Sequence, residues 1–282
     1  MSSSCEASFE TLDPVRIREL IAPLSLDHLA RLTVLDETDS TNSALQRLPV
    51  EQQHAHALLA ESQTGGRGRQ QRNWFSPPGC NVYLSLGWQF VGGKQPLSTL
   101  PLAVAVCTCR ALARTGLKGH GIKWPNDILA GGAKLAGILV ELQAVAAGPA
   151  QAVIGVGVNV CMPKGSAVRS EADASIDRNW TDIASQLPRG SAGVTRNQVA
   201  AALLEELLAG ARTYASAGFS AFKKEWAEHD LLRGRKIQVW HQEHSTGGIA
   251  RGISEDGGLI LEVGGRAETR IFHAGEVRVN YG

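Results

Sequence analysis

The sequence carries almost no excess charge of either sign. It has 28 Lys and Arg against 27 Asp and Glu, a formal net charge of +1. Proteins dedicated to nucleic acids usually carry a clear basic excess, so this balance argues against that class. With 43% hydrophobic and 20% charged residues among 282, the chain can bury a core and is not disordered. The length predicts one large domain with a small one, or two medium ones.

CxxC motifs, a signal-peptide pattern in the first residues and long uncharged apolar runs are also missing. The five cysteines are odd in number and form no CxxC, so neither a disulfide framework nor a zinc knuckle is indicated. We expect reduced thiols at mostly buried positions. The first residues, MSSSCEASFETLD, are polar and acidic, and the longest uncharged apolar stretch, LSTLPLAVAVCTC, is too short to cross a bilayer. These features predict a soluble, cytoplasmic protein without a membrane partner.

Hydrophobic patterning predicts alternating strands and helices through most of the chain. NVYLSLGWQF is the clearest strand, with alternate residues from Val82 to Phe90 on one face. A buried helix follows, capped by Ser98 or Thr99. GIKWPNDILAGGAKLAGILVEL predicts two strands joined at Gly131–Gly132, and a long helix begins with a capping box at Thr195.

Two glycines in a further strand, QAVIGVGVNV, predict a close approach to the sheet. Gly155 and Gly157 remove side chains from one face, which suggests that another group lies against it. After about Leu231 the chain changes to short alternating strands with Gly-rich turns, which is typical of a small β-barrel. We expect a helical lead-in over 1–31, a mixed α+β domain over 32–230 and a barrel over 231–282.

The stretch TGGRGRQQR, residues 64–72, combines backbone freedom with positive charge. Its glycines allow backbone N–H groups to converge on an anion, and its arginines add permanently charged donors. The same composition also suits a solvated surface turn, so the loop by itself leaves both interpretations open. The residues concerned are Gly65, Gly66, Gly68, Arg67, Arg69 and Arg72.

Three further stretches place polar groups in apolar surroundings. In DSTNSALQRL, Asp39 or Ser40 is typical of a helix N-cap, and the hydroxyls and amides beside it either bind a polar ligand head or form an ordinary cap. In KWPNDI, carboxylate and amide oxygens could hold Mg²⁺ and the phosphates that it carries, since Mg²⁺ needs only one or two protein oxygens. Lys134 begins KLAGIL, where it either snorkels or supplies a point charge for a phosphate.

Taken together and in order, these motifs resemble those of biotin protein ligases. The resemblance covers about residue 32 to the end and also includes a C-terminal FHAGEVRV. Some family members carry an N-terminal DNA-binding domain and act as repressors, whereas the stretch before residue 32 is too short for one, so no DNA partner is expected. The motifs are Gln63 with GRGRQQRNW (66–74), DSTN (39–42), KWPND (123–127), KLAGILVE (134–141) and GVGVN (155–159).

The resemblance implies a class II aminoacyl-tRNA-synthetase-like catalytic domain, an SH3-like barrel and a two-step reaction. Biotin and ATP would give biotinyl-5′-AMP with Mg²⁺, and a lysine of biotin carboxyl carrier protein would then be biotinylated. Homodimerisation stays open.

Gln70 and Gln71 depart from the family, in which another basic or small residue is common. The segment around 170–183 would close over adenine but matches less clearly.

Residue roles follow from the matching motifs. The resemblance assigns biotin binding to Ser40, Thr41, Asn42, Gln63, Arg67, Gly68, Arg69, Trp74 and Lys134. It assigns nucleotide binding to Arg69, Arg72, Lys123, Asn126, Asp127 and Asn159. Arg67, Arg69 and Lys134 would carry catalysis, and Asp127 would contact Mg²⁺. Two alternatives remain, a lipoate or octanoate ligase or transferase and a non-catalytic biotin-responsive regulator, which a gel shift with operator DNA would detect.

Overall fold

The computed structural model describes residues 10–91, 96–143, 149–163, 179–188, 193–241, 244–264 and 268–279. The helices are α1 (Pro14–Leu20), α2 (Pro23–Leu26), α3 (Thr41–Gln46), α4 (Leu100–Arg114), α6 (Ile183–Gln186), α7 (Arg196–Ala217) and α8 (Lys223–His229). The first seven strands are β1 (Arg31–Thr38), β2 (His56–Gln63), β3 (Val82–Phe90), β4 (His120–Lys123), β5 (Asp127–Ala130), β6 (Ala133–Gln143) and β7 (Ala150–Val158).

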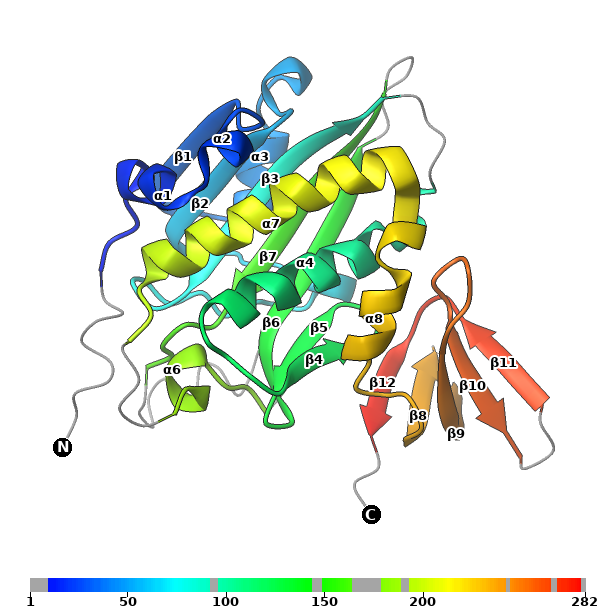
Figure 1. Ribbon diagram of the computed structural model, residues 1–282. Coiled ribbons are helices and arrows are strands. Elements are labelled where there is room, and N and C mark those ends of the chain that lie inside the picture. The colour runs from blue at the N-terminus through cyan, green and yellow to red at the C-terminus, as the bar shows by residue number, and fades with distance from the viewer. Residues whose placement is uncertain are drawn as a thin grey trace.

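These strands form one mixed sheet in the order β1-β2-β3-β7-β6-β5-β4 (Figure 1). β1 and β2 run parallel, and the other neighbours run antiparallel. A second, antiparallel sheet has the order β11-β10-β9-β8-β12, which confirms the predicted mixed sheet followed by a small β domain. Its strands are β8 (Lys236–His241), β9 (His244–Ile253), β10 (Leu259–Val263), β11 (Glu268–Phe272) and β12 (Glu276–Val279).

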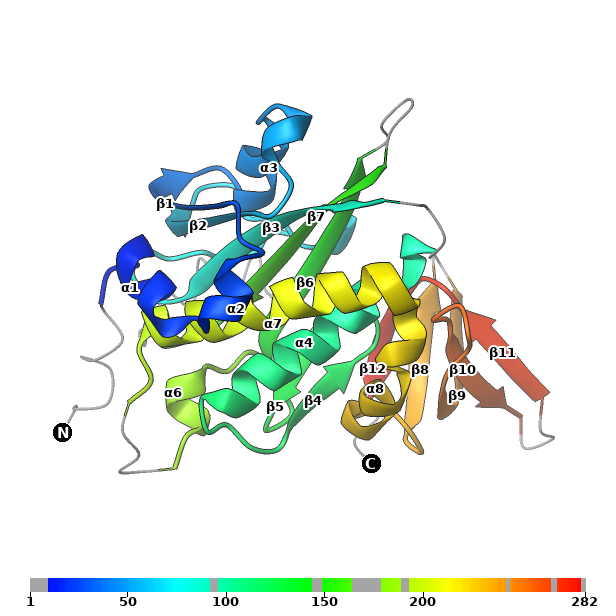
Figure 2. The ribbon, with the colours of Figure 1, turned by 45° about the horizontal axis from the view of Figure 1, so that its top comes forward.

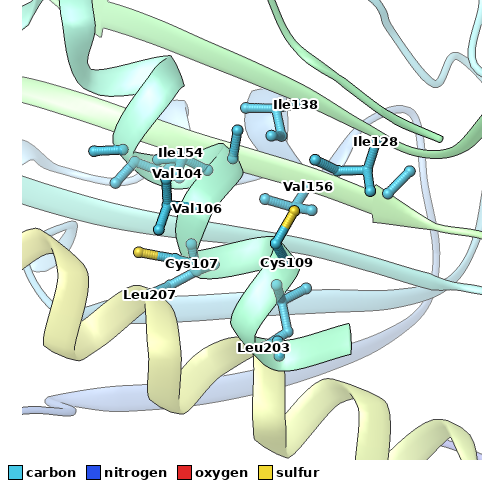
Figure 3. Packing of buried hydrophobic residues seen from close by; sticks show 14 of the residues in the cluster. Val104, Val106, Cys107, Cys109, Ile128, Ile138, Ile154, Val156, Leu203 and Leu207 are labelled. Carbon is cyan, nitrogen blue, oxygen red and sulfur yellow. The ribbon is translucent and has the colours of Figure 1, made fainter. Parts of the chain in front are cut away.

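The main core lies between the large sheet and two long helices. α4 and α7 cover one face, and α3 lies on the other (Figures 1 and 2). The capping box at Thr195 and the inward face of β3 are confirmed. Figure 3 shows the packing of Val104, Val106, Cys107 and Cys109 of α4 with Ile128, Ile138, Ile154 and Val156 of the sheet and Leu203 and Leu207 of α7.

Residues 97–114 are long and apolar enough to cross a membrane by length and composition alone. However, 67% of this window is buried inside the protein, which is the environment of a core helix. The buried cysteines Cys80, Cys107 and Cys109 are free, as expected. Cys161 is disulfide-bonded, so the expectation of reduced thiols is wrong at that position, and Cys5 lies outside the described residues.

One predicted pair of strands is divided further in the structure, and the long helix after Thr195 is followed by a separate short one. GIKWPNDILAGGAKLAGILVEL forms three strands instead of two, because the chain turns at the cis bond between Trp124 and Pro125 before it reaches β5. The turn at Gly131–Gly132 then joins β5 to β6 as predicted. After α7 the chain turns at Gly218, with φ of 66°, and resumes as α8. Trp124 Nε1 donates a hydrogen bond of 3.0 Å to the carbonyl of Gly257, which joins the turn before β5 to the small sheet.

Candidate active site

Three glycines form the floor of a pocket on the sheet face opposite α4 and α7. β-sheet register places Gly157 between Gly137 and Tyr83, and Gly155 between Leu139 and Ser85. All of them except Ser85 line the pocket, and Ser85 donates a hydrogen bond to the pocket-lining Asn42. The sheet face therefore lacks side chains where neighbouring segments come closest.

Asn42 and Trp74 occupy the space that the glycines leave. A Cβ atom built at Gly155 would lie 2.3 Å from Asn42 Oδ1, and one at Gly157 would lie 2.7 Å from the Trp74 ring. Both distances are shorter than any real carbon contact, so neither position accepts a side chain unless a neighbour moves. The predicted close approach to this strand is confirmed, and the approaching groups are themselves predicted site residues.

A buried polar cluster links α3 to β2 and β3. Gln63 Oε1 accepts hydrogen bonds from Thr41 N at 2.9 Å and Thr41 Oγ1 at 3.2 Å, and Gln63 Nε2 donates to Ser76 Oγ at 2.8 Å. Ser85 Oγ lies 2.8 Å from Thr41 Oγ1 and 2.6 Å from Asn42 Oδ1. Because Thr41, Asn42, Ser76 and Ser85 are buried and Gln63 is partly buried, these hydrogen bonds fix the orientation of the side chains beside the pocket.

The bonds already made define what the cluster can offer to a ligand. Asn42 Nδ2 uses both hydrogens, on the Leu139 carbonyl at 3.2 Å and Glu141 Oε2 at 2.8 Å. Since an amide oxygen accepts two hydrogen bonds, Asn42 retains one acceptor site after the bond from Ser85. Gln63 Nε2 retains one hydrogen after its bond to Ser76. The cluster thus presents both an acceptor and a donor.

The Gly/Arg loop is folded over this pocket and not splayed into solvent. Trp74 N donates to the Gly66 carbonyl at 2.8 Å, and Gly68 N donates to the Arg72 carbonyl at 2.7 Å. A Cβ atom at Gly66 would lie 2.5 Å from the Trp74 carbonyl, so this glycine is required for the fold of the loop. Gln70 adopts a positive φ of 54°. The loop therefore has a defined backbone shape.

The three loop arginines contact three different parts of the protein. Arg67 donates to Glu141 of β6 at 3.0 Å. Arg69 is half-buried and approaches Asn126 Oδ1 at 3.4 Å, and burial lowers its pKa while nearby Asp127 raises it. Arg72 donates to Glu276 of β12 at 2.5 Å.

At the end of the pocket beside β5, Lys134 Nζ lies 2.8 Å from Asp127 Oδ1 and 5.3 Å from the centre of the Trp74 ring. Asn126 Nδ2 donates to the Ile138 carbonyl at 2.9 Å. Within the described ranges, no three His, Cys, Asp or Glu side chains gather as metal ligands. Mg²⁺ requires only one or two carboxylates when phosphate oxygens also bind it. The donor set at Asp127 therefore fits a Mg²⁺ ion that arrives with a polyphosphate.

The structure brings every predicted site residue to this one pocket. The residues are Ser40, Thr41, Asn42, Gln63, Arg67, Gly68, Arg69, Arg72, Trp74, Lys123, Asn126, Asp127, Lys134 and Asn159. Asn159 Nδ2 donates to the Thr181 carbonyl at 3.0 Å, so this amide also holds the chain that carries Trp180. Residues 170–178 of the segment expected over adenine lie outside the described residues.

Sequence reasoning missed the contribution of the small sheet and of several wall residues. Gly275, Glu276 and Val277 line the pocket from β12 and the turn before it. FHAGEVRV contains these residues and was the available signal, but nothing in that stretch indicated that it faces the loop. The remaining lining residues without an expected role include Phe75, Tyr83, Met162 and Trp180.

Comparisons with known proteins define the class. The model of the biotin/lipoate A/B protein ligase family matches residues 34–159. A biotin protein ligase structure from Aquifex aeolicus, in complex with biotin and ATP, superposes with a TM-score of 0.72 at 24% identity and covers 89% of this chain and 99% of that one. This likeness establishes the fold: a biotin-protein-ligase-like mixed sheet with a small C-terminal β domain.

Sequence relatives narrow the class further. The bifunctional ligase/repressor BirA of Escherichia coli (strain K12) is 32% identical, covering 91% of this chain and 76% of that protein. Biotin--[acetyl-CoA-carboxylase] ligase of Mycobacterium tuberculosis is 34% identical over 88% of each chain, and that of Paracoccus denitrificans is 31% identical over 86% of this chain and 98% of its own. The chain belongs to the biotin protein ligase family.

Proposed function

We propose that this protein is an ATP-dependent biotin–protein ligase, which activates biotin as biotinyl-5′-AMP and transfers it to a lysine of a carrier protein. The observation that carries the proposal is the convergence of a buried polar cluster, the Gly/Arg loop and the Lys134–Asp127 pair around one pocket. Relatives named as biotin ligases over nearly the whole chain support the same activity.

The polar cluster suits the ureido head of biotin, which has N–H donors and a carbonyl acceptor. Asn42 Oδ1 retains an acceptor site for a ureido N–H, and Gln63 Nε2 retains a hydrogen for the ureido carbonyl. The hydroxyls of Ser40 and Thr41 border the same part of the pocket. This arrangement would place the carboxylate tail under the Gly/Arg loop.

The first step joins two anions, so its main requirement is positive charge. A carboxylate oxygen of biotin attacks the α-phosphorus of ATP, the bond to the bridging oxygen breaks, and pyrophosphate leaves. Arg69 and Lys134 supply fixed positive charge in a partly dehydrated pocket, where it stabilises negative charge more strongly than in water. Asp127 would hold Mg²⁺, which offsets phosphate charge when it is bound.

The second step transfers the acyl group. The neutral amine of the acceptor lysine attacks the acyl carbon of the mixed anhydride, AMP leaves with the electron pair of the broken C–O bond, and the amine loses a proton as the amide forms. The intermediate is labile in water, so the loop that covers the pocket would slow its hydrolysis. We assign the acceptor to the biotin carboxyl carrier protein of an acetyl-CoA carboxylase, in keeping with the relatives' activity.

Pyrophosphate exchange into ATP tests the first step directly. The purified protein with Mg²⁺ is given biotin, lipoate or neither. Exchange that requires biotin supports the proposal, and exchange with lipoate alone would move the protein to the lipoate branch of the matched family. Biotin binding without exchange would favour a non-catalytic regulator. Transfer of labelled biotin to a purified carrier domain then tests the second step.

A further inference from the structure

One carboxylate joins the polar cluster to the Gly/Arg loop. Glu141 Oε2 accepts a hydrogen bond from Asn42 Nδ2 at 2.8 Å and another from Arg67 NH2 at 3.0 Å. The donors come from positions 99 and 74 residues away along the chain, on α3 and on the loop. Glu141 itself lies on β6, beside the pocket-lining Leu139.

The two donors differ in how far they are confined. Asn42 is 3% exposed, and its amide lies closely against the backbone of Gly155. Its orientation decides whether Oδ1 or Nδ2 faces the ligand, and the charge on Glu141 favours the orientation in which Nδ2 points to β6. Arg67 belongs to the loop and reaches over the pocket to the same oxygen. The Glu141 carboxylate therefore affects two features of the pocket. It helps to decide which atom of Asn42 meets the ligand head, and it helps to hold the loop in position through Arg67.

We propose that Glu141 is a positioning residue that couples recognition of the biotin head to closure of the Gly/Arg loop. The inference rests on the proposed function. A carboxylate can hold two N–H donors at once, and its hydrogen bonds to charged donors are stronger than those of a neutral amide. A glutamine in its place would bind Arg67 more weakly because it carries no charge, and it would hold the orientation of Asn42 less strictly because its NH2 group can face Asn42 in place of its oxygen.

Glu141→Gln tests the proposal because the size of the side chain is retained. We expect the biotin KM in pyrophosphate exchange to rise about tenfold, with a smaller change in the ATP KM, and more biotinyl-AMP to be released from the enzyme. Glu262→Gln is the matched control. Glu262 pairs with Arg251 at 2.6 Å, and the exposed fractions of that pair, 28% and 48%, resemble the 25% and 41% of Glu141 and Arg67.

The double variant Arg67→Gln/Glu141→Gln separates coupling from a local packing effect. If Glu141 retains the intermediate through Arg67, the double variant releases no more biotinyl-AMP than Arg67→Gln does. Independent roles would multiply the two effects and overturn the coupling. Arg67→Gln also breaks the ion pair, and it does so at the more exposed partner, where a substitution disturbs the fold less. It therefore still tests the role of the pair if Glu141→Gln lowers stability.

The outcomes separate this inference from the proposed function. A biotin KM and an intermediate release within twofold of those of the unsubstituted protein in Glu141→Gln would overturn the inference alone. If biotin fails to stimulate exchange in the unsubstituted protein, the proposed function is wrong and the inference falls with it.

Discussion

Replacement of Gly155 by alanine should destabilise the protein through one neighbour, Asn42. The new Cβ would lie 2.3 Å from Asn42 Oδ1, whereas ordinary contacts begin at 3.4 Å, so a shift of about 1 Å is needed. Asn42 is held by bonds to Leu139, Glu141 and Ser85. At about 1 kcal/mol net for each, losing two or three of them would cost about 2–3 kcal/mol.

A double-mutant cycle in urea-induced unfolding isolates this effect. Asn42→Ala removes the atoms that clash, so Gly155→Ala should cost little in that background, and the coupling free energy should be about 2 kcal/mol. Gly247→Ala is the matched control in β9, because its Cβ would meet only Gln238 Cγ, at 3.9 Å. It should be neutral or stabilising by about 0.5–1 kcal/mol, since alanine restricts the unfolded chain more than glycine.

The same variant links packing to binding. In the background that retains Asn42, the displaced amide should raise the biotin KM at least about tenfold, which corresponds to about 1.4 kcal/mol. An equal cost of Gly155→Ala with and without Asn42, or an unchanged biotin KM, would refute the argument that this glycine exists to admit Asn42. The Gly247→Ala variant should retain the biotin KM of the unsubstituted protein.

The remaining predictions concern the loop, the charged pair and pH. Arg69→Gly should release biotinyl-AMP into solution, and a level of free intermediate no higher than in the unsubstituted protein would contradict the position of the loop. Lys134→Ala should lower pyrophosphate exchange by at least about tenfold with thermal unfolding little changed, because it removes the positive charge beside Asp127; an unaltered exchange rate would place that role elsewhere. Burial lowers the pKa of His56 and His120 below 6.5, so the unfolded chain binds more protons and the free energy of unfolding should fall as the pH drops below about 6.5. His120→Asn should flatten this fall, and a stability that is constant between about pH 7 and 5.5 would contradict it.

Local patterns predicted much of the architecture because they depend on near neighbours. The alternate residues of β3 from Val82 to Phe90 all join the main core, and the capping box at Thr195 is present, so both predictions are confirmed. The other face of β3 is also buried, which the alternation did not indicate. The prediction of two strands for GIKWPNDILAGGAKLAGILVEL is wrong, because a turn at Pro125 divides the first of them into β4 and β5. The hydrophobic residues on either side suit one strand as well as two, and the local signal for the turn was Pro125 followed by Asn126 and Asp127.

For the candidate site too, the sequence indicated some features and the structure was needed for others. Residue types and their order indicated the polar cluster, the Gly/Arg loop and the Lys134 region, and sheet register then brought them to one face. The glycines at 155 and 157 predicted an approaching group, but only the structure identifies Asn42 and Trp74. A missing side chain reports that space is needed and carries no information on what fills it.

By itself the sequence determined a mixed α+β chain with a small C-terminal β region, a loop suited to anions, and a resemblance specific enough to name a reaction. Only the tertiary structure decided which charges meet. Arg72 pairs with Glu276 across 204 residues, and Glu141 holds two donors from separate elements. Such pairings depend on strand order and register, which are set by the packing of the whole sheet and not by the residues adjacent in the chain.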